Sequence, residues 1–336
     1  MANISKITTS ITKKEINQAT SYMKGIVAHT NGNINKYFLK IKNPEPIWES
    51  YAIRKEEFLK TLSNNGISND ILKQIKNSKN IGELGMAIST FQADFFKIEI
   101  FPIIKQFKPN KAHPLHLEQD IYAKQNLMNN CMRYLHALFS VPSTDPKVAA
   151  IEKILSEKFG IRALLGNDPV EAVKALQAVQ TAKAKGIKIP EEIIVSEFTY
   201  GGAQNLRNAD GSSTILYPTT TSQQVRKLLK PQTTQKIQDI IKKWKDFCQF
   251  KENFSTNNPI HMEMHEIMHQ THSPLYAFKT KKIPEKFMPT VRKLSAYSAV
   301  NTNRTHEVYT ELATKKVLEG LDPNEAELFK FLGGDI

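Results

Sequence analysis

Hydrophobic positions along the chain follow first a helical spacing and then a mixture of helical and strand spacings. From residue 46 to residue 140 the pattern is mainly helical, as in the run from Leu127 to Phe139. Beyond it, helical patterns over 148–159 and 170–185 alternate with strand patterns over 193–200 and 213–217. The sequence Asp210–Gly211 indicates a turn before the second strand. This order predicts an α+β fold: a mainly helical N-terminal region, then a small sheet and further helices.

Composition divides the chain into four parts. Residues 1–24 are rich in Ser, Thr, Asn and Lys, which predicts a mobile N-terminal segment, and residues 25–145 are expected to form a helical domain. The turn cluster 143–146 is the best boundary, so a second domain is expected over 146–320. Residues 321–336 are expected to be an acidic C-terminal tail, because 319–335 holds five acidic residues and one Lys.

A short helix is predicted over residues 259–272. Asn258 can cap it, Pro259 suits the first helical position, and Ser273–Pro274 ends it. The helix carries four histidines at positions i, i+4, i+8 and i+11, which form one stripe: His261, His265, His269 and His272. A stripe of this kind is either a polar helix face or a set of metal ligands.

The sequence from His265 to His269 reads His-Glu-Ile-Met-His, and this spacing favours metal binding. Residues four apart on a helix share one face, so both imidazoles can point at one ion. Glu266 between them is held beside the metal's water, where a carboxylate can serve as general base. Two imidazoles and an open position suit Zn²⁺ better than Ca²⁺ or Mg²⁺, so zinc is the expected cofactor.

A zinc hydrolase needs a third protein ligand, which must come from outside this short helix. His272 lies too close along the helix axis to complete a tetrahedron with the other two histidines. A second helix predicted over 303–319 carries Glu307 and Glu311 on one face. One of these carboxylates can bind zinc while the other accepts the N–H of a ligating histidine. His306 is an alternative ligand, or a group that assists the transition state.

These two motifs resemble the gluzincin metallopeptidases, in particular the catalytic domain of anthrax lethal factor and related bacterial toxin and effector peptidases. The resemblance covers about residues 150–320 and implies a zincin-like metallopeptidase domain there, with the stripe helix as its active-site helix. It implies that His265, His269 and Glu307 bind zinc, that Glu266 is the general base, and that Glu311 orients a ligand. It also implies that Tyr297 stabilises the oxyanion.

Charge and composition bear on partners. Hydrophobic content of 40% and charged content of 24% are typical of a globular protein, and no apolar run is long enough to cross a bilayer. The net charge of +13, concentrated in the basic stretches 226–252 and 279–293, favours an acidic protein substrate, nucleic acid or an anionic membrane surface. Each stretch can also be the solvated face of an amphipathic helix.

Localisation is predicted from the chain ends and the cysteines. The N-terminus lacks the apolar core of a signal peptide, and Cys131 and Cys248 are too few for a disulfide framework. The polar N-terminus and acidic tail resemble signals of effectors that are delivered into a host cell cytoplasm without a signal peptide. The rival hypotheses are a cytoplasmic phage or bacterial housekeeping peptidase, a zinc-binding interaction protein without catalysis, and a nucleic-acid-binding protein whose histidine motif is accidental.

Overall fold

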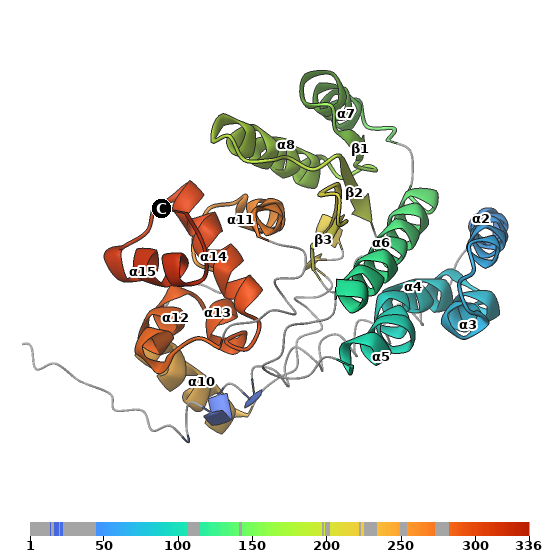
Figure 1. Cartoon of the computed structure of the whole chain (residues 1–336). Coiled ribbons are helices and arrows are strands. Elements are labelled where there is room, and N and C mark those ends of the chain that lie inside the picture. Colours follow the sequence, from blue (N-terminus) through green and yellow to red (C-terminus); the bar gives the residue numbers. More distant parts are fainter. Residues whose placement is uncertain are drawn as a thin grey trace, which may run out of the picture. The chain divides into compact units, whose positions relative to one another are not determined.

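Residues 31–229 and residues 1–30 with 230–336 form two separate units of the computed structural model (Figure 1). We call them the sheet unit and the histidine unit. Within the chain, the structure describes residues 14, 17–19, 21–22, 45–106, 115–140, 143–196, 198, 202–221, 223–224, 234–248, 254–272 and 282–335. The two units together have the expected α+β composition, because a small mixed sheet accompanies many helices.

The first part of the sheet unit is helical, as predicted from residues 46–140. Its helices are α2 (Glu45–Asn64), α3 (Asn69–Asn77), α4 (Ile81–Phe95), the π-helix η1 (Phe96–Ile100), α5 (Phe101–Ile104) and α6 (Leu115–Leu138). Aromatic side chains form much of the core: the ring centroid of Phe91 lies 6.3 Å from that of Phe58 and 6.1 Å from that of Phe95. All three rings are buried. Burying a phenylalanine side chain removes a large apolar area from water, which stabilises this helical core.

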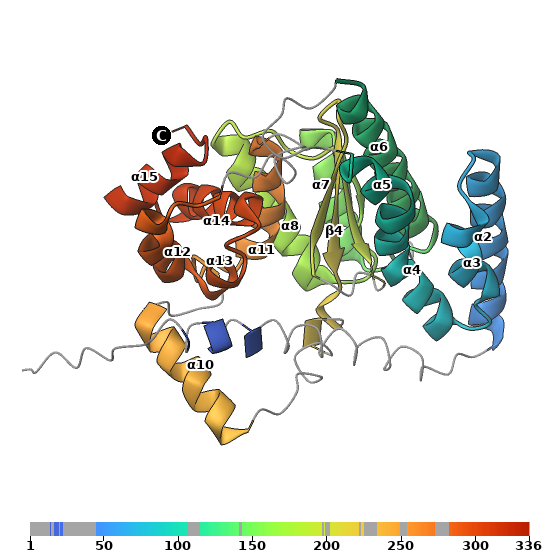
Figure 2. The ribbon, with the colours of Figure 1, turned by 60° about the horizontal axis from the view of Figure 1, so that its bottom comes forward.

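Within the described residues, the sheet has four strands in the order β1 (Arg162–Leu164), β2 (Glu192–Ser196), β4 (Ser213–Pro218) and β3 (Gln204–Arg207). β1, β2 and β4 run parallel, and β3 pairs antiparallel with β4. Helix α6 lies on one face, and α7 (Pro146–Phe159) and α8 (Pro169–Ala184) lie on the other (Figure 2). Because both faces are covered, every residue of β2 and β4 is buried.

Both strands predicted from the sequence are present as β2 and β4. The sequence pattern of 213–217 also suits an edge strand that could align an extended peptide, but β4 lies in the interior of the sheet. It is hydrogen-bonded to β2 on one side and to β3 on the other. The edges of the sheet are β1 and β3, two short strands that the sequence pattern did not predict. The turn at Asp210–Gly211 is confirmed, since Gly211 has a φ of 82° and Asp210 accepts hydrogen bonds from Ser212.

The turn at residues 143–146 does not separate the two units. Helix α6, before the turn, packs on the sheet after it: Asn129 Nδ2 donates to the backbone oxygen of Arg207 at 2.7 Å, and His136 Nδ1 lies 2.8 Å from Ser196 Oγ. The helical part and the sheet therefore share one core, and the unit boundary falls at Leu229–Lys230 instead.

All the secondary-structure elements that the structure describes in the histidine unit are helices. Its elements are α10 (Gln235–Cys248), α11 (His261–Met268), the 3₁₀ helix η2 (His269–Thr271), the 3₁₀ helix η3 (Glu285–Phe287), α12 (Met288–Leu294), α13 (Ala296–Val300), α14 (Thr305–Leu318) and α15 (Pro323–Phe331). Helix α14 lies at its centre and packs against α11, α12, α13 and α15. Residues 307–314 are consequently all buried, including both acidic ones.

The sequence predicts a mobile segment at the N-terminal end of the chain and an acidic tail at the C-terminal end. Most of residues 1–24, and with them the prediction of a mobile segment, lie outside the described residues. The C-terminal residues 321–336 instead include α15, which begins with a capping box between Asp322 and Glu325 and buries Leu328 and Phe329. The acidity of this segment thus belongs partly to a helix cap. Among the described helices, none is long and apolar enough to cross a membrane.

Parts of both basic stretches lie in described helices. In 226–252, residues 225–233 and 249–253 are outside the described residues, whereas α10 carries the exposed Lys236 and Lys242. In 279–293, the exposed lysines include Lys286, which forms an ion pair with Glu327 at 2.9 Å. Some of this charge is therefore neutralised locally, as is usual for solvated helix faces.

Candidate metal centre

The helix predicted over 259–272, which carries the histidine stripe, begins two residues later than predicted, as α11. Asn258 Oδ1 accepts a hydrogen bond from the backbone of Ile260, and its backbone oxygen accepts one from His261. Because Asn258 closes this short turn, Pro259 precedes the helix instead of occupying its first position. The α-helix ends at Met268 and continues as the 3₁₀ turn η2, which carries His269. The predicted stop at Ser273–Pro274 lies outside the described residues.

The carboxylates of Glu307 and Glu311 are buried on α14, one turn apart, with 7% and 0% of each residue exposed. A tight turn places the start of this helix: the backbone N–H of Arg304 donates to the oxygen of Asn301 at 2.8 Å. Asn301 in turn donates from Nδ2 to the backbone oxygen of Tyr297 at 3.0 Å. The Asn-containing segment between Tyr297 and Glu307 therefore fixes how α13 leads into α14.

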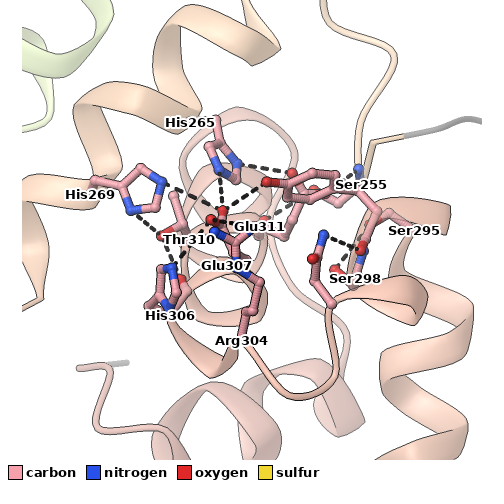
Figure 3. Close-up of polar contacts among 12 residues, drawn as sticks. Ser255, His265, His269, Ser295, Ser298, Arg304, His306, Glu307, Thr310 and Glu311 are labelled. Carbon is pink, nitrogen blue, oxygen red and sulfur yellow. Dashed lines mark hydrogen bonds and ion pairs between the residues drawn. The ribbon is translucent and has the colours of Figure 1, made fainter. Parts of the chain in front are cut away.

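Three of the predicted ligands converge on one point. Oε2 of Glu307 lies 3.3 Å from Nε2 of His265 and 3.6 Å from Nε2 of His269. In Figure 3 both imidazoles point towards the Glu307 carboxylate. Ligand atoms about 2.0–2.1 Å from a tetrahedral zinc ion lie roughly 3.3–3.4 Å from one another. Two imidazole nitrogens and a carboxylate oxygen at this separation fit a zinc ion.

Glu266 lies beside the same point. It is 8% exposed, and one of its carboxylate oxygens is within 4.8 Å of ring nitrogens of both His265 and His269. Oε2 of Glu307 lies 3.3 and 3.6 Å from the Nε2 atoms of the same two histidines. Both carboxylates are therefore close enough to the histidine pair to take part in a metal site.

Glu311 orients the first ligand histidine. Its Oε1 accepts a hydrogen bond from Nδ1 of His265 at 3.0 Å, which leaves Nε2 of that ring directed at Glu307. The carboxylate is itself held by the backbone N–H of Ser255, which donates to Oε2 at 2.8 Å. This is the supporting role that the resemblance implied for Glu311, and it fixes which ring nitrogen of His265 is available to a metal.

Thr310 orients the second ligand histidine, and the sequence analysis missed it. The Thr310 hydroxyl donates to the backbone oxygen of His306 at 2.7 Å, so its oxygen can accept from Nδ1 of His269 at 3.1 Å. Nε2 of His269 is then left for a metal. The position of Thr310 between the two glutamates of α14 was the available signal, since a helix that supplies a ligand also presents its neighbours to the partner helix.

The two alternative histidine ligands occupy other places. Nε2 of His272 lies 2.9 Å from Nδ1 of His269, on the opposite side of that ring from Nε2. Nε2 of His306 lies 3.2 Å from Oε1 of Glu307, the second oxygen of that carboxylate. His272 thus contacts the Nδ1 side of His269, and His306 contacts Glu307 through a different oxygen from the one nearest the two motif histidines.

Two further groups surround the Glu307 carboxylate. The Tyr297 hydroxyl donates to Oε2 at 3.0 Å, so Tyr297 lies at the site as predicted. Arg304, whose side chain is 57% exposed, lies 3.9 Å from Oε1 (Figure 3). Burial raises the pKa of Tyr297, and the negative charge of Glu307 raises it further. The hydroxyl therefore stays protonated and remains a hydrogen-bond donor at neutral pH.

Electrostatics keep both carboxylates ionised. Burial alone would raise the pKa of Glu307, but hydrogen bonds from His265 and His306 lower it well below its usual value. Burial likewise opposes ionisation of Glu311, and hydrogen bonds from His261 and His265 outweigh it and lower its pKa. Ionised carboxylates beside neutral imidazoles are groups that can hold a cation.

The two motif histidines differ in the direction of their pKa shifts. Burial lowers the pKa of His269 well below its usual value, so this ring is neutral. Burial would also lower the pKa of His265, but hydrogen bonds to Glu307 and Glu311 raise it to about 10. A metal ion would therefore displace a proton from Nε2 of His265, as is usual when a metal occupies a histidine site.

No protein-family model, curated protein or solved structure matches this chain at a significant level.

Proposed function

We propose that the protein is a zinc-dependent endopeptidase, with His265, His269 and Glu307 as the zinc ligands and Glu266 as the general base. The observation that carries the proposal is the convergence of Nε2 of His265 and His269 on Oε2 of Glu307, at 3.3 and 3.6 Å. His265 and Glu307 lie on different helices and are 42 positions apart in the sequence. A chance match to the short histidine motif does not explain why the Glu307 carboxylate meets the two histidines.

The donor set favours zinc over the other common divalent cations. Ca²⁺ and Mg²⁺ prefer six or more oxygen ligands, whereas two imidazoles with one carboxylate and an open fourth position are typical of catalytic zinc. The orienting contacts of Glu311 and Thr310 to the Nδ1 atoms also match what catalytic zinc sites need around their ligands.

The proposed chemistry is hydrolysis of a peptide bond. Bound zinc would supply an activated water and polarise the scissile carbonyl. Glu266 accepts a proton from the attacking water and delivers it to the leaving amine, which its position beside both motif histidines allows. The Tyr297 hydroxyl lies 3.0 Å from Oε2 of Glu307. From this position it donates a hydrogen bond to the carbonyl oxygen of the substrate, which becomes negative during the attack.

The substrate we propose is an acidic protein, because the net charge of +13 attracts negatively charged partners over long range. Delivery as a toxin or effector into a host cell, and the alternative housekeeping role, stay predictions from the sequence. Contacts of the basic stretches with nucleic acid or an anionic membrane also stay predictions.

Metal analysis of purified protein tests the proposal first. We expect one zinc ion per chain in the wild type and none in the His265→Ala, His269→Ala double variant. His116→Ala, which changes an exposed histidine on α6, is the matched control and should keep its zinc. Stoichiometric zinc that persists in the double variant would refute the site.

Cleavage assays separate an enzyme from a zinc-binding interaction protein. Glu266→Gln should bind zinc as the wild type does but cleave an unfolded acidic protein such as reduced casein far more slowly. Glu285→Gln, at an exposed position, is the control. If the wild type holds zinc but cleaves no member of a diverse peptide library, the interaction-protein alternative is favoured.

A further inference from the structure

His261, the first histidine of the stripe, lies on α11 and has no role in the proposed function. It is 3% exposed and precedes the ligand His265 by one helical turn. The ring of Phe254 stacks on it, with ring centroids 4.9 Å apart. A buried histidine is costly unless its ring nitrogens are satisfied, so its hydrogen bonds indicate its role.

One carboxylate oxygen connects His261 to the candidate metal site. Oε1 of Glu311 accepts from Nε2 of His261 at 2.9 Å and from Nδ1 of His265 at 3.0 Å. The other oxygen of Glu311 is held by the backbone of Ser255. An ionised carboxylate only accepts hydrogen bonds, so both imidazoles must donate to it. The direction of both hydrogen bonds is therefore fixed.

Thr256 selects the tautomer of His261 that can donate to Glu311. Its oxygen accepts a hydrogen bond from the backbone of Asn258 at 3.3 Å, and its hydroxyl lies 2.9 Å from Nδ1 of His261. The hydroxyl proton can therefore be donated to Nδ1, which places the ring proton on Nε2. A chain of hydrogen bonds then runs from Thr256 through His261 and Glu311 to His265.

We infer that His261 is a positioning residue for the metal centre: by donating to Glu311, it holds the carboxylate in the orientation that presents Nε2 of His265 to zinc. The inference rests on the proposed zinc site. His261 lies outside the His-Glu-x-x-His motif and acts on the ligand His265 only through Glu311. Loss of such an outer hydrogen bond weakens metal binding by about ten- to a hundredfold in comparable sites.

A second metal ion held by His261, His265 and Glu311 is the competing explanation, since their donor atoms lie within 4.8 Å of one another. The distances favour hydrogen bonds. Both imidazoles approach the same oxygen at 2.9 and 3.0 Å, which is shorter than the roughly 3.3 Å expected between ligands of one tetrahedral ion.

The test compares three variants of the full chain by zinc affinity, using a competing chelator, and by the visible spectrum of the Co²⁺-substituted protein. His261→Leu removes both hydrogen bonds. His261→Gln retains a donor near Nε2 but not the contact with Thr256. Thr256→Val removes that contact and the hydrogen bond from the backbone of Asn258, but leaves His261 and Glu311 in place. His116→Leu is the control. Thermal unfolding of the metal-free proteins separates a folding defect from a change at the metal.

We expect His261→Leu to bind zinc about ten- to a hundredfold more weakly with an altered Co²⁺ spectrum, and His261→Gln and Thr256→Val to lie between it and the wild type. Unchanged zinc affinity and spectrum in His261→Leu would overturn the inference, while zinc binding by the wild type would still support the proposed function. Two ions per wild-type chain, with one lost in His261→Leu, would also overturn it. Absence of zinc from the wild type would instead refute the proposed function itself.

Discussion

Nε2 of His265 lies 3.3 Å from Oε2 of Glu307, although 42 positions separate the two residues in the sequence. The relationship depends on α11 and α14 packing side by side with their polar faces turned towards each other. Burying ionisable groups in this way is unfavourable unless they are paired or bind a metal. The buried groups are paired with one another by hydrogen bonds. Several consequences of the proposed zinc site can be measured.

The two glutamates of α14 should differ in their effect on zinc. Glu307→Ala is expected to remove the metal or weaken its binding severely, because only two protein ligands remain. Glu311→Ala should keep zinc with an affinity about ten- to a hundredfold lower, because it orients His265 without touching the ion. Zinc titration of both variants measures the difference. Equal losses, or retention of zinc by Glu307→Ala, would contradict the assignment.

Replacing the proposed general base should lower the cleavage rate without changing zinc binding. Glu266→Gln is expected to retain stoichiometric zinc and to reduce the rate of peptide-bond cleavage by about two to four orders of magnitude, since it removes the proton acceptor. The measurement is kcat on any peptide that the wild type cleaves, with zinc content measured on the same sample. A cleavage rate equal to that of the wild type would exclude the proposed mechanism.

Thr310 should contribute to zinc binding through His269. Thr310→Val keeps the shape of the side chain but removes the oxygen that lies 3.1 Å from Nδ1 of His269, so zinc affinity should fall by about tenfold. Thr314→Val is a matched control one turn later on α14, because that buried hydroxyl has no hydrogen-bond partner among the residues that the structure describes. Similar zinc affinities in the two variants would show that Thr310 does not orient the ligand.

Stability of the sheet unit should depend on pH through His136. Burial lowers its pKa to about 4, whereas an unfolded histidine has a pKa of about 6.5. Between these values the unfolded chain binds a proton that the folded chain does not, so the free energy of unfolding should fall as pH decreases from 6.5 to 4. The full loss is about 3 kcal/mol.

Urea unfolding of chelator-treated protein between pH 4 and pH 7 measures this dependence, with His136→Gln as the comparison. The variant lacks the titrating ring, so its stability should change less over this range than that of the wild type. An identical pH dependence in both proteins would show that another group is responsible.

Local signals in the sequence predicted much of the fold. Asp145 and Asp168 cap α7 and α8, and Gly160 and Gly186 follow these helices with left-handed φ angles, so both helices were predicted within a residue or two of their bounds. β1, with only three residues, is too short to show a hydrophobic pattern. The run Ser213–Tyr217 could not reveal whether its strand was central or at an edge, because that depends on β3.

The residues of the candidate site were also predicted only in part. The helical spacing of the motif histidines and of Glu307 and Glu311 identified the residues that meet, since i and i+4 positions share a face. The roles of Ser255 and Thr256 could not be predicted, because both lie in an irregular segment that reaches α14 or His261 only after folding. Thr310 was missed because a threonine within a helix is more often a structural residue.

The most direct test is a crystal structure of the zinc-loaded protein with anomalous diffraction data collected at the zinc absorption edge. The proposed site predicts one strong peak about 2.0–2.2 Å from Nε2 of His265, Nε2 of His269 and a carboxylate oxygen of Glu307. A peak among His261, His265 and Glu311, or no zinc peak bound to His265 and His269, would contradict it.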